Sequence, residues 1–404
     1  MSKFLTVGDV CNITTGSLDS NAFVENGKYP FYTCAKEPTN IDTYAFDDDV
    51  VLVAGNNAQG NFHVNRFKGK FNAYQRTYIL TSKGEKSIDY IYYLLSLALK
   101  LLKDKSQGSQ TKFLTIGILK EIHVPNLANS QIVAKVLSDL DTKIELNNRI
   151  NRELEAMAKT LYDYWFVQFD FPDANGKPYK SSGGKMVYNA ELKREIPEGW
   201  EVKTLLDIAT YTNGLACQKF RPTNEDFLPV IKIREMRDGI NENTEKVRAD
   251  IPEKLKVFNG DVLFSWSASL EVIIWTGGKG GLNQHIFKVT SKKYPRSFYY
   301  FQLIWYLQHF KMIAELRKTT MGHITQDHLK QSRIVVPPID IVKNLDKQLK
   351  PVQEKQILIN RQNQHLTALR DWLLPMLMNG QVTVKEAEER LSMAAEPSVE
   401  YKKG

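Results

Sequence analysis

Two long segments of the chain carry apolar residues at alternating spacings of three and four. A spacing of this kind, held over about five heptads, is typical of helices that pack along a coiled-coil seam. We therefore predict spacer helices over residues 128–168 and 339–379. The positions that carry the pattern are Val133, Leu137, Leu140, Ile144, Asn147, Asn151, Leu154, Ala158, Leu161 and Trp165 in the first segment, and Leu345, Leu349, Val352, Gln356, Ile359, Asn363, Leu366, Arg370, Leu373 and Leu377 in the second.

Two prolines interrupt the second of these segments. Because proline lacks a backbone N–H, Pro351 predicts a kink or a restart of the helix, and Pro375 predicts a break near its end. At 1.5 Å per residue, about 36 helical residues in each segment would span roughly 54 Å. Two such helices packed antiparallel would hold the parts of the chain that precede them far apart.

The region before each spacer helix is rich in short runs of β-branched and aromatic residues. Each region also contains one clear helical pattern near its end, at about 88–104 and 296–317. Strands followed by a helix of this kind indicate an α+β fold with a strand-rich core. We predict domain 1 over residues 1–127 and domain 2 over residues 198–338.

The two halves of the chain repeat the same series of segments. Tyr74–Leu80 corresponds to Asn283–Val289, and Leu114–Lys120 corresponds to Ile324–Lys330. Asp49 and the apolar strand that follows it correspond to Asp261 and the apolar strand that follows it. The spacer helices share the motif Asn-Arg-x-Asn-x-x-Leu, at 148–154 and 360–366. A duplicated chain can place two similar surfaces about a pseudo-twofold axis, which suits a long and roughly symmetric ligand such as duplex DNA.

Composition narrows the class of protein. The 404 residues are 42% hydrophobic and 25% charged, and the net charge of +8 mildly favours a polyanionic partner. The first residues lack the apolar core of a secretory signal, and no run of 18 apolar residues predicts a membrane span. Cys11, Cys34 and Cys217 are scattered, which fits a reducing compartment, so we expect a cytoplasmic protein.

The sequence lacks the motifs of the common catalytic sites. There is no HExxH and no Walker A spacing, and Val336-Pro337-Pro338-Ile339 differs at both flanks from the motif of adenine methyltransferases. A nuclease-like match at Pro172-Asp173 and Glu201-Val202-Lys203 is short enough to arise by chance. Residues 277–281 indicate a mobile loop, not a phosphate cradle. We therefore predict no catalytic residue and no metal site.

Polar and basic residues gather in loops at corresponding places of both domains. Asn and Gln can pair with adenine and Arg or Lys with guanine, while Lys, Ser and Thr also bind phosphates. For one residue alone a solvated surface position is the simpler interpretation, but recurrence favours DNA contact for the set. The predicted DNA-binding residues are Asn56, Asn57, Gln59, Lys68, Lys70, Gln75, Arg76, Gln107, Ser109, Gln110, Lys112, Lys219, Arg221, Lys232, Arg234, Arg237, Ser265, Trp266, Ser267, Lys279, Gln284, Arg317, Lys318, Thr320 and His323.

The segments that follow the spacer helices differ from both domains. Residues 169–197 are rich in Gly, Pro, Ser and Asn and predict a surface connector. Residues 380–404 predict a charged tail with a short helix and some disorder.

The chain resembles the specificity subunits of type I restriction-modification systems. The resemblance covers nearly the whole chain and rests on the duplicated Asn-Arg-x-Asn-x-x-Leu helices and on the connector Gly176-Lys177-Pro178-Tyr179-Lys180-Ser181-Ser182-Gly183-Gly184-Lys185-Met186-Val187, which leads to Ile196-Pro197-Glu198-Gly199-Trp200. It implies two target-recognition domains, each of which reads one half of an asymmetric bipartite DNA site, and an antiparallel coiled coil that sets the gap between the halves.

The resemblance also implies partners and cofactors. Two methyltransferase (modification) subunits would dock on the spacer helices, and restriction-translocation subunits would join through them. S-adenosylmethionine, ATP and Mg²⁺ would be bound by those partners, and this chain would bind no cofactor itself. The predicted coiled-coil and docking residues are Leu137, Leu140, Ile144, Asn148, Arg149, Asn151, Leu154, Leu161, Leu349, Val352, Ile359, Asn360, Arg361, Asn363, Leu366 and Leu373.

Other functions remain open at this stage. The chain could be the specificity subunit of a type II enzyme that cuts beside a bipartite site, and neighbouring genes would separate these two cases. It could be a nuclease or methyltransferase in its own right, which turnover of DNA by the isolated chain would reveal. It could also be a coiled-coil assembly protein unrelated to DNA. Equal affinity for random duplex and for a methylated bipartite motif, measured with partners present, would favour that alternative.

Overall fold

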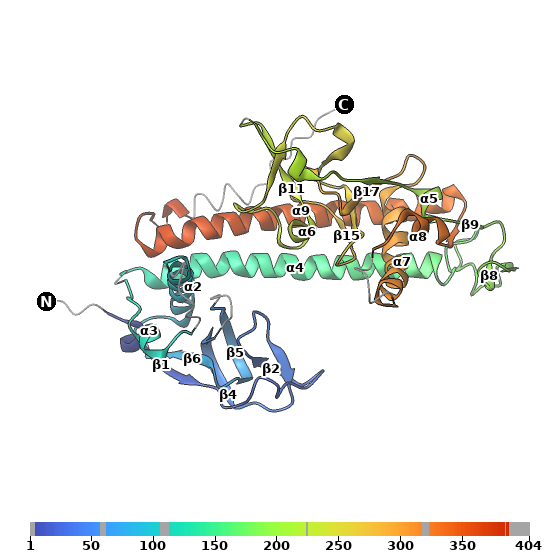
Figure 1. The fold of residues 1–404 in the computed structure, drawn as a ribbon. Helices are drawn as coiled ribbons and strands as arrows, with labels where there is room; N and C mark the ends of the chain where they lie inside the picture. The colour runs from blue at the N-terminus through green and yellow to red at the C-terminus, as the bar shows by residue number, and fades with distance from the viewer. Residues whose placement is uncertain are drawn as a thin grey trace. The chain divides into compact units, whose positions relative to one another are not determined.

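The computed structural model describes residues 5–56, 62–105, 113–125, 127–223, 225–316, 323–383 and 385–387 (Figure 1). The chain forms two compact units. Unit 1 comprises Met1–Glu145 and His365–Gly404, and unit 2 comprises Leu146–Gln364. Each unit therefore contains one predicted domain together with parts of both predicted spacer helices.

Unit 1 is built on a six-stranded sheet with the order β1-β6-β4-β5-β2-β3. All neighbouring strands are antiparallel except β2 and β5, which are parallel. The strands are β1 (Cys11–Thr15), β2 (Tyr29–Tyr32), β3 (Thr39–Ile41), β4 (Phe46–Ala54), β5 (Val64–Ala73) and β6 (Thr77–Ser82).

Three helices complete domain 1. They are α1 (Val7–Val10), α2 (Ile88–Lys105) and α3 (Ile116–Lys120). The hydroxyl of Thr115 accepts a hydrogen bond from the amide of Ile118 and so caps the start of α3. Helix α2 is the helix predicted near 88–104, and its Tyr90, Ile91 and Leu95 are fully buried.

Unit 2 contains the same strand order in two sheets. The orders are β10-β17-β14-β15 and β12-β11-β16-β13, and β18-β9 and β7-β8 form separate pairs. The strands are β7 (Met186–Asn189), β8 (Arg194–Pro197), β9 (Glu201–Lys203), β10 (Thr210–Asn213), β11 (Phe227–Ile231), β12 (Lys246–Arg248), β13 (Lys256–Val257), β14 (Val262–Ser265), β15 (Glu271–Ile274), β16 (Gly280–Leu282), β17 (Ile286–Thr290) and β18 (Ile334–Val336).

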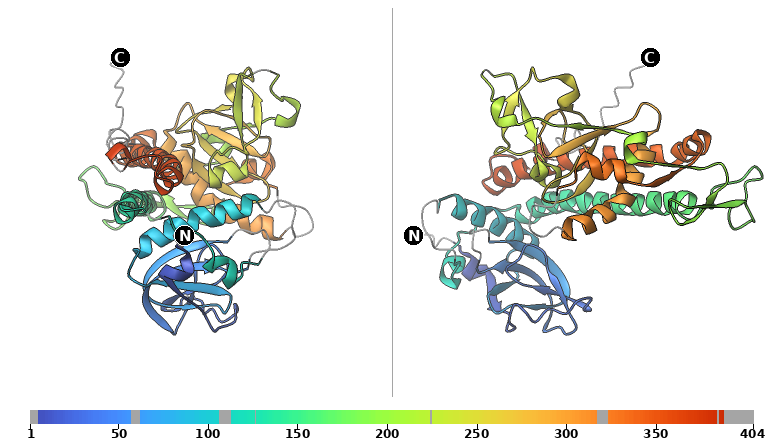
Figure 2. Two further views of the ribbon diagram at one scale, coloured as in Figure 1. Left: turned by 90° about the vertical axis from the view of Figure 1, so that its left-hand side faces the viewer. Right: turned by 45° about the vertical axis from the view of Figure 1, so that its right-hand side comes forward.

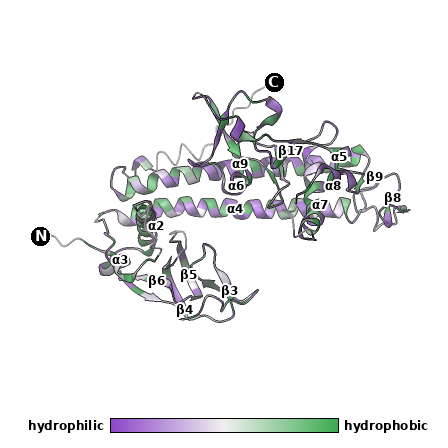
Figure 3. Ribbon diagram, in the orientation of Figure 1, coloured by the Kyte–Doolittle hydropathy of each residue, from purple (hydrophilic) through white to green (hydrophobic). Residues whose placement is uncertain are grey.

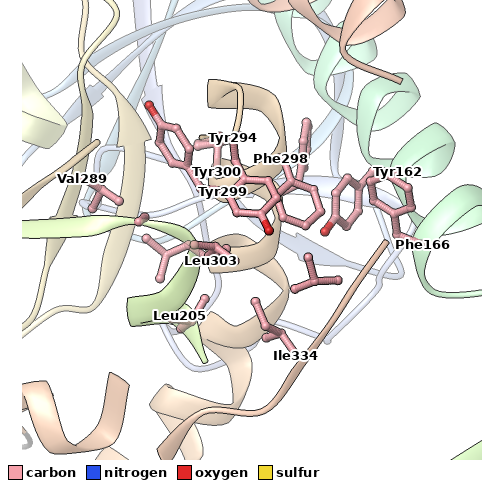
Figure 4. Packing of buried hydrophobic residues seen from close by; sticks show 14 of the residues in the cluster. Tyr162, Phe166, Leu205, Val289, Tyr294, Phe298, Tyr299, Tyr300, Leu303 and Ile334 are labelled. Carbon is pink, nitrogen blue, oxygen red and sulfur yellow. The ribbon is translucent and has the colours of Figure 1, made fainter. Parts of the chain in front are cut away.

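The helices of domain 2 are short apart from one. They are α5 (Leu205–Ile208), η1 (Cys217–Lys219), α6 (Ile233–Asp238), η2 (Glu253–Leu255), α7 (Arg296–Leu316) and α8 (Gln326–Gln331). Helix α7 carries much of the core of unit 2, where Tyr294, Phe298 and Leu303 lie beside Leu205 and Ile334 (Figure 4). It is the helix predicted near 296–317.

A glycine-rich turn explains why one sheet in domain 1 becomes two in domain 2. The pairing of β15 with β14 and of β16 with β11 matches that of the two ends of β5. Between β15 and β16 the chain leaves the sheet, and Gly278 adopts a φ of 85°, which favours glycine. The prediction of a mobile loop over residues 277–281 was wrong for Gly280 and Gly281, because they lie in β16. A Cβ on Gly281 would lie 2.5 Å from Val247, so close packing requires glycine there.

Backbone hydrogen bonds repeat between the two domains. The amide of Leu114 donates to the carbonyl of Gly55 (3.0 Å), and that of Ile324 donates to Trp266 (2.9 Å). The amide of Gly55 in turn donates to Arg76. Its counterpart, Trp266, donates to His285 in the same way. The two domains thus share one local backbone frame, as the repeat predicted.

The structure corrects one detail of that repeat. Likeness of side chains aligns Asp49 with Asp261. The strand ladders instead pair Val51 with Leu80, and Val262 with Val289. Since Leu80 corresponds to Val289, Val51 corresponds to Val262, and the sequence alignment was wrong by one residue. The register of a strand is set by its hydrogen-bond ladder and by which face is buried. The presence of an aspartate before both strands does not set it.

Both predicted spacer segments are helices. They are α4 (Ser130–Phe166) and α9 (Ile339–Met378). Apolar and polar residues alternate along both (Figure 3). Helix α9 passes through Pro351 without a restart and through Pro375 without a break, so the predictions of a restart and of a break were wrong. It ends at Met378, and Gly380, two residues further on, adopts a φ of 68°, which favours glycine after a helix.

Within each unit, α4 and α9 lie side by side (Figures 1 and 2). In unit 1, Leu137 and Leu140 share an apolar cluster with Leu366 and Leu373. In unit 2, Asn147 contacts Asn363 and Asn151 contacts Asn360, so residue numbers rise on α4 as they fall on α9. The two helices therefore run antiparallel in unit 2. Leu345 and Leu349 are buried in an apolar cluster of unit 2, and Leu373 and Leu377 are buried in the apolar cluster of unit 1. This burial stabilises α9 near both of its prolines.

The segment predicted as a surface connector is in part a folded element. Phe169 and Phe171 are 3% and 5% exposed, and the ring of Phe171 stacks on Tyr179 at a centroid distance of 4.6 Å. The carboxylate of Asp170 accepts two hydrogen bonds from Ser181, and these hold its pKa below the usual value. The aromatic residues drive this burial. The Gly- and Pro-rich composition of the segment predicted a surface connector instead, so the burial was not indicated by the sequence. Most of the predicted tail, 380–404, lies outside the described residues.

Two class predictions concern the chain as a whole. In the part of the chain that the structure describes, no helix has both the length and the apolar character needed to cross a bilayer. Over the same residues, no group of His, Cys, Asp and Glu is placed to hold a metal ion.

Candidate nucleic-acid interface

Domain 1 has a hollow at the end of β4 where several predicted residues meet. Its volume is about 510 Å³, and its lining residues are Thr15, Gly55, Gln75, Arg76, Tyr78, Phe113, Leu114, Thr115 and Ile116. Gln75 and Arg76 are exposed at its edge, and Asn56 lies next to it, bridged to Phe113. Of the predicted DNA-binding residues in domain 1, the structure brings Asn56, Gln75 and Arg76 together.

The hollow combines apolar surface with hydrogen-bonding groups. Phe113 and Ile116 are 55% and 40% exposed, which is unusual for large apolar side chains. Burial raises the pKa of Tyr78, and its protonated hydroxyl donates to the carbonyl of Leu114 at 2.9 Å. None of the lining residues is acidic. An aromatic floor with a basic, amide-bearing edge is typical of sites for nucleic-acid bases.

The corresponding place in domain 2 is filled by Trp266. Its indole N–H donates to the side-chain oxygen of Asn213 at 3.1 Å. Its rings lie 5.5 Å from His285, 5.5 Å from His323 and 5.9 Å from Phe287, measured between centroids. Of the predicted DNA-binding residues of domain 2, the structure brings Trp266, Gln284 and His323 into one region, although Trp266 is half-buried and its N–H is already paired.

Other predicted residues of domain 1 lie elsewhere. Lys68 and Lys70 pair across the sheet with Asp49 and Asp47, at the opposite end of β4 from Gly55. The ammonium of Lys70 lies 4.6 Å from the ring centroid of Tyr44. Asn57, Gln59, Gln107, Ser109, Gln110, Lys112, Arg317, Lys318 and Thr320 lie outside the described residues.

Several predicted cations of domain 2 are paired with carboxylates. Lys232 pairs with Glu245, Arg234 with Glu235, and Arg237 with Glu271. Arg221 lines a second hollow, of about 340 Å³, together with Lys246. Lys219 and Lys279 are exposed. Pairing with acids cancels the charge of three predicted DNA contacts, which sequence alone could not reveal.

Two predicted serines are wrong as surface contacts. Ser265 is fully buried at the end of β14, and its hydroxyl donates to the carbonyl of Ser269 at 2.5 Å. Ser267 is 5% exposed. Ser265 ends β14 and its hydroxyl bonds backbone groups of the turn that follows, and Ser267 lies in that turn between β14 and β15.

The sequence predictions missed residues that complete the two regions. Thr15, Tyr78 and Phe113 line the hollow of domain 1, and Asn213 and His285 contact Trp266 in domain 2. Only His285 carried a usable signal, because the repeat aligns it with Arg76. Tyr78 belongs to an apolar strand that predicts a core position, and Thr15 and Asn213 precede glycines of turns.

The predicted docking set falls into two groups. Asn148, Arg149 and Arg361 are exposed, and the other members of the set are buried or partly buried. The buried ones, which cannot form a docking surface, are Leu137, Leu140, Leu349, Ile359, Leu366 and Leu373. In the helix contact, the buried amide of Asn147 donates to Gln362 at 2.9 Å and to Asn363 at 2.8 Å. Asn147 was predicted as a seam position but not as a functional residue.

A polar cluster in unit 1 joins three helices. Asp141 of α4 accepts hydrogen bonds from Tyr93 of α2 and from Arg370 of α9, each at 2.7 Å. Burial, with Asp141 as the second cause, raises the pKa of Tyr93, so its hydroxyl remains a donor at any physiological pH. Arg370 was predicted as an interruption of the seam, and the structure shows it as a link between helices.

Replacement of this arginine tests the cluster. We expect Arg370→Ala to lower the free energy of unfolding by about 1–3 kcal/mol, because Asp141 would keep only the hydrogen bond from Tyr93. The side chains of Arg370 and Asp141 are 30% and 29% exposed, so solvent screens part of the effect. Lys135→Ala breaks an ion pair with 70% and 60% exposed side chains, and we expect a change within about 0.5 kcal/mol. Equal urea midpoints for the two variants would contradict the prediction.

Comparison with known proteins identifies the class. The model of the family described as "Type I restriction modification DNA specificity domain" matches residues 2–156 and 197–368. These ranges cover most of the chain, and they correspond to its two halves. The chain belongs to this family of DNA-specificity proteins. As a member it has the role of a specificity subunit, which recognises DNA, and not that of a catalytic subunit.

Individual relatives agree with the family. The chain is 27% identical over 313 residues to the MjaIX specificity subunit of Methanocaldococcus jannaschii, covering 74% of this chain and 70% of that subunit. It is 35% identical over 145 residues to the EcoDI specificity subunit of Escherichia coli, covering 35% of this chain and only 32% of that subunit. The fold resembles that of the type I S subunit from M. genitalium, with a TM-score of 0.58 at 14% identity, over 92% of this chain and 94% of that one.

Proposed function

We propose that domain 1 and domain 2 each read one half of an asymmetric bipartite DNA sequence. The observation that carries this proposal is the shared backbone frame with different side chains at the same places. Arg76 and Phe113 in domain 1 stand where His285 and His323 stand in domain 2. The shared backbone arrangement indicates that the two domains bind DNA in the same way. The different side chains on it indicate that the two domains prefer different bases.

We propose further that α4 and α9 form an antiparallel coiled coil that sets the gap between the half-sites. The contacts of Asn147, Asn151 and Glu155 with α9 support this arrangement, since buried polar pairs fix the register of a helix pair. A fixed register between the two helices fixes the length of the helix pair, and so the separation that it can set. Gln356 donates to Glu155 at 2.9 Å and extends the series of contacts by one more turn of each helix.

Two modification subunits and the restriction subunits are the proposed protein partners. The exposed Arg149 and Arg361 occupy the same position in the repeated motif of the two helices, so they offer two similar surfaces to two copies of one partner. S-adenosylmethionine, ATP and Mg²⁺ are proposed as ligands of those partners and not of this chain.

Methylation mapping of the host genome by single-molecule sequencing tests the proposal. We expect that deletion of the gene abolishes methylation at one motif with two unequal halves and a fixed gap, and that the restored gene brings it back. Loss of a continuous or palindromic motif would contradict the reading by two different domains. Unchanged methylation would contradict the proposed function altogether.

A further inference from the structure

The hollow of domain 1 and the Trp266 cluster of domain 2 are the same place in the repeat. The indole of Trp266 contacts Asn213, His285, Phe287 and His323. The ladders and the backbone hydrogen bonds give these residues the counterparts Thr15, Arg76, Tyr78 and Phe113, in that order. All four counterparts line the hollow, and the counterpart of Trp266 itself is Gly55. Domain 2 therefore fills with its own ring the space that the described residues of domain 1 leave open.

From this equivalence we infer that the hollow over Gly55 binds the ring of a single DNA base, in the place that the indole of Trp266 occupies in domain 2. The inference rests on the proposed DNA reading by domain 1 and adds a specific pocket to it. The indole shows what the frame accommodates, which is a flat bicyclic ring with an N–H directed at the side chain of residue 213. A purine has the same overall shape, and Thr15 offers a hydroxyl where Asn213 offers an amide.

A side chain at residue 55 cannot fill the hollow of domain 1. A Cβ on Gly55 would lie 2.6 Å from the carbonyl oxygen of Arg76 and 2.9 Å from the ring of Tyr78. No side chain fits at residue 55 without a backbone shift, so this position cannot fill the hollow as Trp266 does in domain 2. Its volume of about 510 Å³ falls within the usual range of small-ligand pockets.

The edge of the hollow favours a base over an aromatic side chain of a protein partner. Phe113 exposes 55% of its surface and offers a face on which a base can stack. Gln75 supplies both a donor and an acceptor, and Arg76 supplies donors and a positive charge beside the phosphates. None of the described residues that line the hollow is acidic, so no carboxylate among them repels a polyanion.

A base can enter this pocket only after it has left the duplex stack. Extrusion costs free energy, and the cost is smallest when the base has no pairing partner. An abasic site opposite the bound base should therefore tighten binding. In domain 2 the same lesion should have no such effect, because Trp266 already occupies the place.

The experiment uses the full chain assembled with its modification subunits and duplexes that contain the bipartite motif found by methylation mapping. An abasic site is placed opposite each base of both half-sites in turn, leaving out the adenines that the complex methylates. Affinity is measured by fluorescence anisotropy. We expect binding to tighten about tenfold or more at one position of the half-site read by domain 1, and at no position of the other half-site.

Two isoleucines of α3 provide a matched pair of variants. Ile116 lines the hollow and is 40% exposed, whereas Ile118 is 44% exposed and does not line it. Ile116→Trp should fill the hollow and reduce the preference for the abasic duplex to about twofold or less. Ile118→Trp should keep the full preference. Because both side chains are exposed, we expect both variants to fold, and their circular dichroism spectra verify this.

The outcomes separate the inference from the proposed function. If the complex binds its motif but no abasic site in the half-site of domain 1 tightens binding, the pocket is wrong and the DNA reading stands. Equal behaviour of the two tryptophan variants also overturns the pocket. If the complex does not distinguish its motif from random duplex, the proposed function itself fails.

Discussion

Insertion of seven residues into each long helix should lengthen the gap of the recognised DNA sequence and leave both half-sites unchanged. The insertions belong between Asn148 and Asn151 in α4 and between Asn360 and Asn363 in α9, where the two helices contact each other. One heptad adds about 10 Å of helix and returns the apolar face to nearly the same direction. That rise equals about three base-pair steps, so we expect a gap longer by one to about three base pairs.

The matched control inserts the heptad into α4 alone. The pairs of Asn147 with Asn363 and of Asn151 with Asn360 could then no longer form together, and we expect loss of methylation at every motif. The measurement is the methylation pattern of a host that carries each variant. If the double insertion changed a half-site, or left the gap as it was, the helices would not act as a ruler.

Exchange of domain 1 for that of another family member should change one half-site and leave the other half and the gap intact. The reason is that the proposed base contacts of domain 1, including Gln75 and Arg76, lie within residues 1–127. The structure also shows a constraint on the exchange. Leu95 and Leu119 of domain 1 share an apolar cluster with Leu137 of α4 and with Leu373 and Leu377 of α9.

The design therefore compares two chimaeras. One exchanges residues 1–127 only, and the other exchanges the whole of unit 1, Met1–Glu145 with His365–Gly404. We expect both to show the same new half-site and the second to have the higher unfolding midpoint, because it keeps the native packing of domain 1 on its helices. Methylation mapping reads the motif of each chimaera. A change in both half-sites would show that the domains do not read DNA independently.

The sequence predicted the long elements well, because their signal is repeated many times. The seam positions placed α4 and α9 within two residues of their ends, and the α+β character of both domains followed from strand-like runs and one long helix in each. Local rules failed where packing over the whole helix outweighs them. Pro375 removes one hydrogen bond, but the neighbouring Leu373 and Leu377 are buried and hold the helix together.

The structure brings some of the predicted DNA-binding residues together and shows that others are buried or paired. Residue types chosen for DNA chemistry included Gln75, Arg76 and Trp266, which do lie at the equivalent regions of the two domains. They also included Ser265, which is buried, and Arg237, which is paired with Glu271. A one-letter pattern records the type of a side chain but not its partners, and partners decide whether a charge or hydroxyl is available.

The sequence by itself determined that this chain is duplicated, that each half ends in a long amphipathic helix, and that its chemistry is recognition. These properties follow from patterns that extend over many residues. Only the tertiary structure decided that Gly55 and Trp266 are equivalent, since the register of β4 and β14 is set by strand pairing and differs by one residue from the best match of side chains. Without this one-residue correction, the open hollow of domain 1 and the filled place in domain 2 would not be matched. Alternate positions of a strand face opposite sides of the sheet, so an alignment that is wrong by one residue compares side chains on opposite faces.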